Sequence, residues 1–157
     1  MTHSMSAVAI LLALSGGFTG ASSQAAPTIV GKWNIEYARG QRVENDVVTN
    51  IMAKGTITIA VSGDSLLATL DQPPRPDGSP TPTAMLGGRL VNGQAVFVQK
   101  QTVQLNMDGQ MHSAEAITTW TLLVTGDAMT GGIARDIPSM PMPPRDPSPV
   151  TGTRSKA

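Results

Sequence analysis

The pair Asp108-Gly109 stands between two runs of alternating apolar and polar residues, and this feature most limits how the chain can fold. Asp-Gly between β-rich runs is typical of a two-residue type I′ turn, because both central positions need a positive φ. With this pair as the loop, residues 94–107 and 110–124 are predicted to form an antiparallel hairpin. The expected cross-strand partners are Met107 with Gln110, Leu105 with His112, Val103 with Ala114 and Phe97 with Trp120.

The two faces of this hairpin differ in chemistry. Side chains alternate across a strand, so one face carries the charged, hydroxyl and amide side chains and is predicted to face water. The other face mixes apolar and polar residues and is predicted to face inward: Phe97, Gln99, Gln101, Val103, Leu105, His112, Ala114, Ala116, Thr118, Trp120 and Leu122. We expect residues 96–124 to be paired on both sides, at the centre of the sheet.

Alternation recurs through most of the remaining chain. Residues 29–37 and 55–70 have the period of two that is typical of half-buried strands, with a turn at Gly63-Asp64 inside the second run. Asn92-Gly93 predicts another type I′ turn. That turn places Leu90 opposite Ala95 and Gly88 opposite Phe97. Shorter strands are expected over residues 129–135 and 150–157.

Three segments do not alternate. Residues 39–52 fit a helical turn or an irregular strand equally well. Residues 71–83 and 137–149 are rich in proline and are predicted to be loops. The total is eight or nine short strands in up-and-down order, and closing them removes exposed sheet edges. The predicted fold class is therefore all-β, an up-and-down antiparallel barrel of about eight strands with two Pro-rich loops.

The N-terminus has the features of a secretory signal peptide. Residues 7–14 form an apolar run, and Ser23 and Ala25 supply small side chains at positions −3 and −1 of a cleavage site. The run is shorter than the ~20 apolar residues that span a bilayer. We expect Sec-dependent export and cleavage near Ala25, which leaves residues 26–157 as one domain, periplasmic or secreted and not inserted in a membrane. A retained anchor or a later start is the alternative, because residues 1–6 contain no Lys or Arg.

Charge and composition exclude several classes of function. Eleven basic residues balance eleven acidic ones, and charged residues make up only 14% of the 157-residue chain. Without a basic run, the chain lacks the electrostatic signature of nucleic-acid binding or of a polybasic membrane patch. The chain has no cysteine, so a disulfide framework and thiolate chemistry are excluded.

Gly31-Lys32-Trp33 resembles the G-x-W motif of lipocalins and other calycin barrels. The resemblance implies that Trp33 packs across the closed end of a barrel against an arginine from the last strand, and Arg154 stands at the corresponding place. Both residues would then be structural. The turns at residues 63–66 and 126–131 are also similar to a turn that is repeated in small exported bacterial barrels.

The inward face favours a binding function. An eight-stranded barrel is just wide enough to be filled by side chains or to hold one small ligand. Small inward residues (Ala68, Gly88, Ala95, Ala114, Ala116 and Gly131) favour a space for a small, mostly apolar ligand. The predicted ligand-binding residues are Tyr37, Phe97, Gln99, Gln101, His112, Thr118 and Trp120.

The alternative is a filled core in a structural or protein-interaction module that works through its Pro-rich loops. In that case each small inward residue compensates for a large one opposite it, as Gly88 would for Phe97. A cavity open at one end would favour ligand binding, whereas a solid interior with an exposed apolar patch would favour the module. The sequence itself does not define an oligomeric state.

Catalytic and metal-binding patterns are weak. His112 is the one histidine after the leader, and no Gly-x-Ser-x-Gly elbow is present to form a hydrolase triad. Most carboxylates stand in turns or beside the Pro-rich loops, where they do not form a cation cage. Met107, Met111 and His112 have the soft ligands that suit Cu(I), but methionine also fills gaps in a small core. We expect no enzymatic activity, cofactor or metal site.

Overall fold

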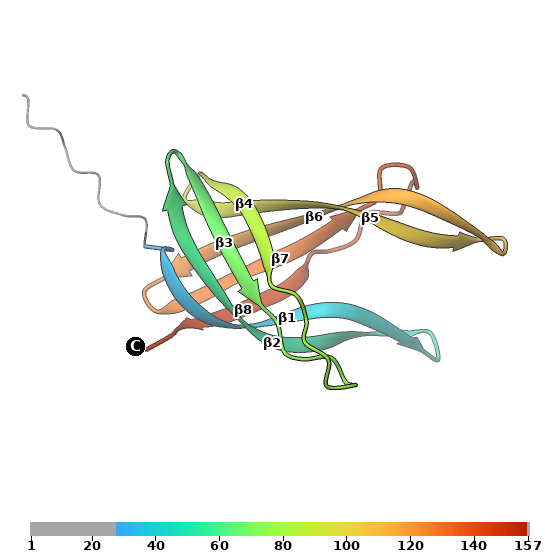
Figure 1. Ribbon diagram of the computed structural model, residues 1–157, viewed down its shortest axis with the longest axis horizontal. Coiled ribbons are helices and arrows are strands. Elements are labelled where there is room, and N and C mark those ends of the chain that lie inside the picture. Colours follow the sequence, from blue (N-terminus) through green and yellow to red (C-terminus); the bar gives the residue numbers. More distant parts are fainter. Residues whose placement is uncertain (1–27, 157) are drawn as a thin grey trace, which may run out of the picture.

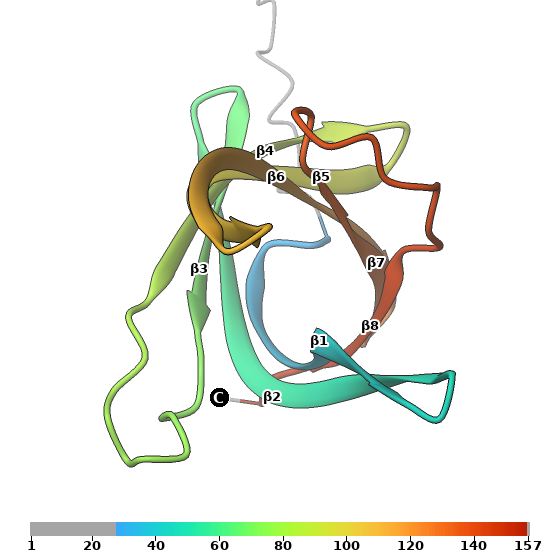
Figure 2. The same ribbon diagram turned by 90° about the vertical axis from the view of Figure 1, so that its right-hand side faces the viewer.

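The structure is a computed structural model that describes residues 28–156, so the predicted signal peptide lies outside the described residues. Consecutive strands pair antiparallel, and the last strand pairs with the first, which closes the sheet into a barrel (Figures 1 and 2). The predicted all-β, up-and-down fold is confirmed. Over residues 28–156 no helix is long and apolar enough to cross a membrane. The eight strands are β1 (Gly31–Glu44), β2 (Val47–Ser62), β3 (Ser65–Asp71), β4 (Ala84–Val91), β5 (Gln94–Met107), β6 (Gln110–Thr125), β7 (Ala128–Asp136) and β8 (Ser148–Arg154).

Tight turns set the strand registers. Asp108 and Gly109 have φ of 53° and 78°, and Asn92 and Gly93 have φ of 49° and 79°, as a type I′ turn requires. All of the cross-strand pairs expected around these two turns are present. The segment 39–52, for which helix and strand were equally favoured, belongs to the β1–β2 hairpin. Its turn is Asn45-Asp46, with φ of 50° and 63°. Both residues can occupy this turn without glycine, because Asn and Asp tolerate the left-handed conformation better than most residues.

One end of the barrel is closed by the residues that precede β1. Ile29 is buried in the main core, and its carbonyl oxygen accepts a hydrogen bond of 2.8 Å from Nε1 of Trp33. Arg154 donates to the carbonyl oxygens of Val30 and Thr28 at 3.0 and 2.6 Å. Its guanidinium lies 4.2 Å from the centroid of the Trp33 ring, so the contact expected between these two residues is present. Viewed along the barrel, the chain before β1 crosses this far end (Figure 2).

Side chains fill the barrel next to this closed end. A Cβ atom at Gly88 would collide with the Phe97 ring, and one at Gly131 would collide with the carbonyl oxygen of Thr121. The small inward residues therefore compensate for bulk beside them at these positions. The largest fully buried side chains belong to Trp33, Phe97, Ile57, Ile59, Leu86, Leu122, Met129 and Val150.

At the opposite end, two hairpins continue past the barrel as two-stranded arms (Figure 1). Pairing between β1 and β8 ends at Tyr37 and pairing between β2 and β3 begins at Thr56, so residues 38–55 form the β1–β2 arm. Pairing between β4 and β5 ends at Val98 and pairing between β6 and β7 begins at Ile117, so residues 99–116 form the β5–β6 arm.

The expectation that residues 96–124 are paired on both sides is wrong for the β5–β6 arm. The reason is strand length. β5 and β6 have 14 and 16 residues, whereas their outer neighbours β4 and β7 have 8 and 9. β6 runs beyond the end of β7, and β5 runs beyond its last pair with β4, whose first residues pair with β3 alone, so each of the two long strands keeps one free edge there.

Candidate functional site

Both arms and both Pro-rich segments lie at one end of the barrel, which we call the arm end. In an up-and-down barrel the connections alternate between the two ends, so the turns after β1 and β5 share an end with the connections 72–83 and 137–147 (Figure 1). The other end holds the short turns and the Trp33–Arg154 contact. Surface that extends beyond the core is therefore concentrated at the arm end.

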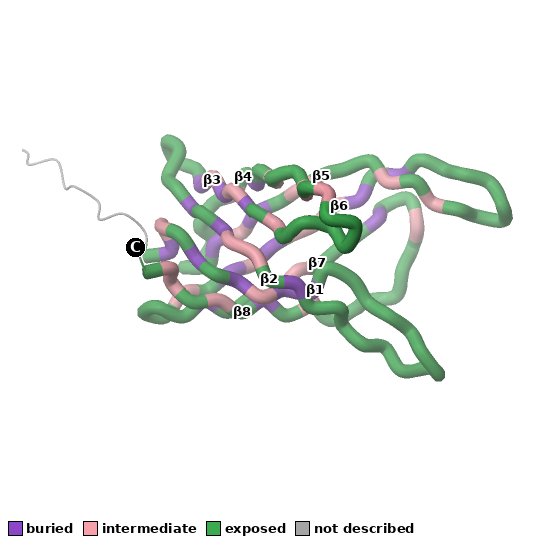
Figure 3. Tube along the Cα trace, turned by 60° about the horizontal axis from the view of Figure 1, so that its bottom comes forward, coloured by how far each residue is buried: buried purple, intermediate pink, exposed green. Residues whose placement is uncertain are grey.

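A β-bulge marks the base of the β1–β2 arm. Tyr37 pairs with Ala53 and Ala38 with Met52, but the next pair is Gly40 with Ile51, which leaves Arg39 without a cross-strand partner. An extra residue in one strand bends that strand and increases its twist. The arm consequently leaves the barrel wall, and every residue from 39 to 52 is exposed (Figure 3).

The β1–β2 arm exposes aliphatic side chains on both faces. Val43 pairs with Val48, and these two side chains are 65% and 57% exposed. Met52 lies on the same face at 42%, while Val47 and Ile51 lie on the other at 61% and 44%. A two-stranded hairpin alone is marginally stable in water, so a ribbon with this much uncovered apolar surface gains stability when another chain covers it.

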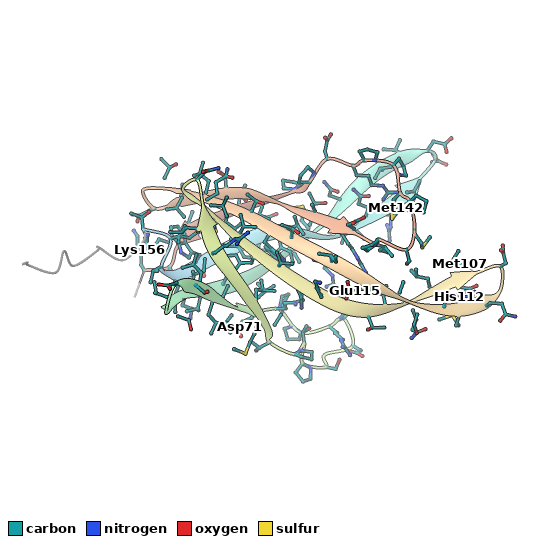
Figure 4. All side chains as sticks on the ribbon, turned by 90° about the horizontal axis from the view of Figure 1, so that it is seen from above. Asp71, Met107, His112, Glu115, Met142 and Lys156 are labelled. Atoms are coloured by element: carbon teal, nitrogen blue, oxygen red, sulfur yellow. The ribbon has the colours of Figure 1, made fainter. Side chains whose placement is uncertain are left out.

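The β5–β6 arm is covered in part by the chain itself. Ile137 and Met140, from the connection between β7 and β8, pack against a patch on the arm formed by Val103, Leu105, Ala114 and Ala116. The tip beyond this patch is exposed, and Figure 4 places Met107 and His112 there. Met142 lies elsewhere, at a distance from both (Figure 4). Among residues 28–156, no group of three or more His, Asp or Glu side chains is arranged to hold a metal ion.

The first Pro-rich segment is held by its own hydrogen bonds. The hydroxyl and backbone amide of Ser79 donate to Oδ1 of Asp77 at 2.6 and 2.9 Å, and these bonds lower the pKa of Asp77. The Thr83 hydroxyl donates to Oδ1 of Asp71 at 2.9 Å, which ties the end of the segment to its start.

Two hollows of about 500 Å³ each lie on the outside of the barrel. The first runs along the outer wall over β6, β7 and β8 and is bounded by Pro147 and Pro149. The second separates the Val43–Val48 face of the β1–β2 arm from residues 144–148. Neither hollow opens into the barrel interior that was predicted to hold a ligand.

The residues predicted to bind a ligand are distributed between the barrel and an arm. Tyr37, Phe97 and Trp120 are buried inside the barrel, and the rings of Tyr37 and Trp120 are 5.5 Å apart at an angle of 53°. Gln99 and Thr118 are half-buried opposite each other on the inward face. Gln101 follows Gln99 on the same face but is exposed on the β5–β6 arm, and His112 is exposed near the tip of that arm, away from the barrel.

Two buried polar atoms in this group have no hydrogen-bond partner, the Tyr37 hydroxyl and Nε1 of Trp120. A buried donor without a partner costs about 1–3 kcal/mol, so such atoms are uncommon unless a bound molecule satisfies them. Burial also raises the pKa of Tyr37, and the nearby charge of Arg39 opposes this shift.

The fold and the arm end define the protein as a closed, eight-stranded, up-and-down β-barrel with two hairpin arms. Comparison of the chain with protein-family models, curated proteins and solved structures found no match in any of the three.

Proposed function

We propose that this protein is a non-catalytic interaction module in which a packed barrel presents the β1–β2 arm to another protein chain. The observation that carries the proposal is the exposure of aliphatic side chains on both faces of an arm whose strands have free edges. Free strand edges bind extended segments by β-augmentation, in which backbone hydrogen bonds add a strand and side chains select the partner. The predicted leader would place this interaction in the periplasm or outside the cell.

The packing of the interior supports this choice over a ligand carrier. Side chains fill the closed half of the barrel, and Gly88 leaves room for the Phe97 ring. The apolar surface that lacks a cover is on the arm instead. A filled interior with an exposed apolar patch is the combination expected of an interaction module.

Site-specific photo-crosslinking in the native host tests the proposal. Benzoylphenylalanine would replace Val48 on the arm and, as a matched control, Thr58, an exposed residue of the same strand on the barrel wall. We expect a discrete higher-mass adduct from position 48 and none from position 58. Equal yields at the two positions, or no adduct from position 48, would contradict an arm-specific interaction.

A second candidate function is a calycin-like barrel that binds a small, mostly apolar ligand. The unpartnered Tyr37 hydroxyl and Trp120 Nε1 favour it, because one acceptor oxygen on a ligand could accept from both donors. Gln99 and Thr118 would contact the remainder of the ligand, and Trp33 with Arg154 would keep the far end closed.

Native mass spectrometry of protein purified from its own host tests this second function. The ligand should appear as a constant mass increment on the wild-type protein and should be lost from Tyr37→Phe, which keeps the ring and removes one donor. An unliganded wild-type mass, or an increment that survives in Tyr37→Phe, would count against a ligand held by this hydroxyl.

A further inference from the structure

We propose that the chain bound by the β1–β2 arm is a second copy of this protein, paired edge to edge along β2 about a two-fold axis at Asn50. This inference rests on the proposed interaction function and adds the identity of the partner. It follows from the free edge of β2, from the direction of its backbone groups and from the order of its charged and apolar residues.

The free edge of β2 is long and regular. β2 pairs with β3 over residues 56–62, so residues 47–55 have a partner on the β1 side alone. The bulge lies in β1, and β2 keeps its alternation unbroken through this region. Nine consecutive residues, 47–55, are therefore available to a further strand.

The turn determines which backbone groups face that edge. Glu44 and Val47 flank the two-residue turn, so they form a hydrogen-bonded pair and direct their amide and carbonyl groups at each other. Backbone direction alternates along a strand. The amide and carbonyl groups of Val48, Asn50, Met52 and Lys54 consequently point away from β1, toward the free edge.

An antiparallel pairing centred on Asn50 matches these groups with their own copies. Asn50 then faces Asn50 of the second copy in a hydrogen-bonded pair, and Val48 faces Met52 of the second copy in the next one. The close pair of Thr49 with Ile51 lies between these two, and the close pair of Val47 with Ala53 follows Val48 with Met52. At each end of the ribbon this register brings the turn residue Asp46, which directly precedes β2, next to Lys54 of the second copy, so opposite charges meet twice.

Charge selects this register over its neighbours. Moving the axis to Ile51 places the Lys54 ammonium opposite Val48 and leaves Asp46 beyond the pairing. Moving it to Thr49 places Asp46 opposite Met52 and takes Lys54 beyond the pairing. Of these three, the Asn50 axis is the one that pairs both charged residues with opposite charges.

The same pairing brings the exposed apolar side chains of the two copies side by side on one face. Val43 pairs with Val48, and Ala38 pairs with Met52. In the dimer these become one row across four strands, in the order Val43, Val48, Met52 of the second copy and Ala38 of the second copy. Cross-strand rows of this kind are the unit of sheet stabilisation. At the axis the two Asn50 residues face each other. Within each copy, Nε2 of Gln41 donates to Oδ1 of Asn50 at 3.2 Å, so one glutamine flanks the Asn50 pair on either side.

The β5–β6 arm does not offer an equivalent edge. Past the last β4–β5 pair, the residues whose backbone groups face the free edge of β5 are Lys100, Thr102, Gln104 and Asn106, and all four are polar and exposed. Where β6 runs beyond β7, the corresponding residues are Met111, Ser113 and Glu115, which are exposed and of which Glu115 is charged. Charged and polar side chains on an edge discourage strand pairing, whereas β-branched and apolar ones favour it. The β2 edge is therefore the one suited to a second copy.

Single-cysteine variants test the register directly, because the chain has no cysteine of its own. Paired residues on the axis have Cα atoms about 5.5 Å apart, within reach of a disulfide, whereas residues two positions off the axis lie about 13 Å from their own copies. Under mild oxidation Asn50→Cys should form a covalent dimer, and Val48→Cys and Met52→Cys should not. Val43→Cys tests the alternative, in which two copies pair along β1. A covalent dimer of Val43→Cys without one of Asn50→Cys would overturn the assignment of the interface to β2.

Sedimentation velocity over a range of concentrations tests whether the association is specific. Asn50→Pro removes an amide that faces the free edge and leaves the β1–β2 hydrogen bonds intact, so it should give a monomer with an unchanged circular dichroism spectrum. Lys54→Asp places two carboxylates together and should weaken dimerisation at least tenfold. The double variant Asp46→Asn with Lys54→Asp removes the opposing carboxylate, while asparagine keeps the left-handed turn, and it should recover dimerisation.

The possible failures separate the two proposals. A wild-type protein that stays monomeric at every concentration overturns the second-copy inference. If position 48 nevertheless crosslinks to a different protein in the host, the interaction function stands without it. Failure of Asp46→Asn to rescue Lys54→Asp overturns the Asn50 register even if a dimer forms.

Discussion

The guanidinium of Arg154 lies 4.2 Å from the centroid of the Trp33 ring, and the two residues face each other in the pairing of the last strand with the first. One contact therefore joins the two ends of the folded chain. The same guanidinium holds the carbonyl oxygens of Thr28 and Val30, so it also fixes the residues that close this end of the barrel.

A double-mutant cycle measures that contact. Trp33→Ala should cost ~3–5 kcal/mol of unfolding free energy, because it removes a large, fully buried side chain. Arginine over an indole contributes ~0.5–2 kcal/mol, so the cycle with Arg154→Ala should give a coupling energy in that range. Urea unfolding of the four proteins supplies the values.

Asp127→Ala is the control: it removes the 3.2 Å ion pair of Arg154 with a carboxylate that is 86% exposed, and should have little effect. Coupling indistinguishable from zero would mean that the stacking does not stabilise the fold.

Adjacent glycines in β4 provide a matched test of core packing. A Cβ atom at Gly88 would collide with the Phe97 ring and the Val96 carbonyl oxygen, whereas one at Gly87 would have no atom within 4 Å. Gly88→Ala should therefore lower the unfolding free energy by ~1–3 kcal/mol through overpacking. Gly87→Ala should be neutral or slightly stabilising, because alanine reduces the entropy of the unfolded chain. Similar melting temperatures for the two variants would show that the interior around Phe97 can accommodate an additional methyl group.

The parts of the fold that could be predicted from sequence depend on local turn chemistry. Asn92-Gly93 and Asp108-Gly109 determined the pairing of Gly88 with Phe97 and of Phe97 with Trp120, because a two-residue loop leaves one register. Asn45-Asp46 carried the same signal in a weaker form, since neither residue is glycine. The bulge at Arg39 then broke the alternation of β1, which is why residues 39–52 fitted two interpretations.

The arms could not be predicted, because they depend on where pairing with the outer neighbouring strands ends. Nothing within residues 94–124 indicates that pairing with β4 stops at Val98 or that β7 pairs only as far as Ile117. His112 and Gln101 were accordingly placed on the inward face of a barrel wall that does not extend to them. The unpartnered Tyr37 and Trp120 atoms depend on the packing of side chains from separate strands, and the spacing of residues does not reveal it.

Burial of Tyr37 predicts a loss of stability at high pH. Burial raises the pKa of the phenol above its ordinary value of 10.0, and Arg39 partly opposes the shift. The unfolded protein therefore loses this proton first. The contribution of Tyr37 to stability is fully present below about pH 10 and is lost as the pH rises through the higher pKa of the folded state.

Urea unfolding between pH 8 and pH 11 should show a steeper decline of the unfolding free energy for the wild type than for Tyr37→Phe. Parallel curves would indicate that the hydroxyl reaches water in the folded protein. Tyr37 is the only tyrosine, so its absorbance titration assigns the folded-state pKa without overlap.

Amide hydrogen exchange should distinguish the barrel from the β5–β6 arm within one strand. Val91 and Gln94 flank a two-residue turn, so the amides of Val96 and Val98 face β4. The amides of Lys100 and Thr102 face the same side but lie beyond the last β4–β5 pair, Gly87 with Val98. We expect Val96 and Val98 to exchange only by extensive unfolding of the barrel, and Lys100 and Thr102 to exchange within minutes of transfer to D₂O, as followed by two-dimensional NMR. Gln101, whose amide faces β6, is the internal control and should be slower than Lys100 and Thr102. Protection of Lys100 and Thr102 equal to that of Val96 would mean that a further strand covers the β5 edge in solution, and the arm would then not be free.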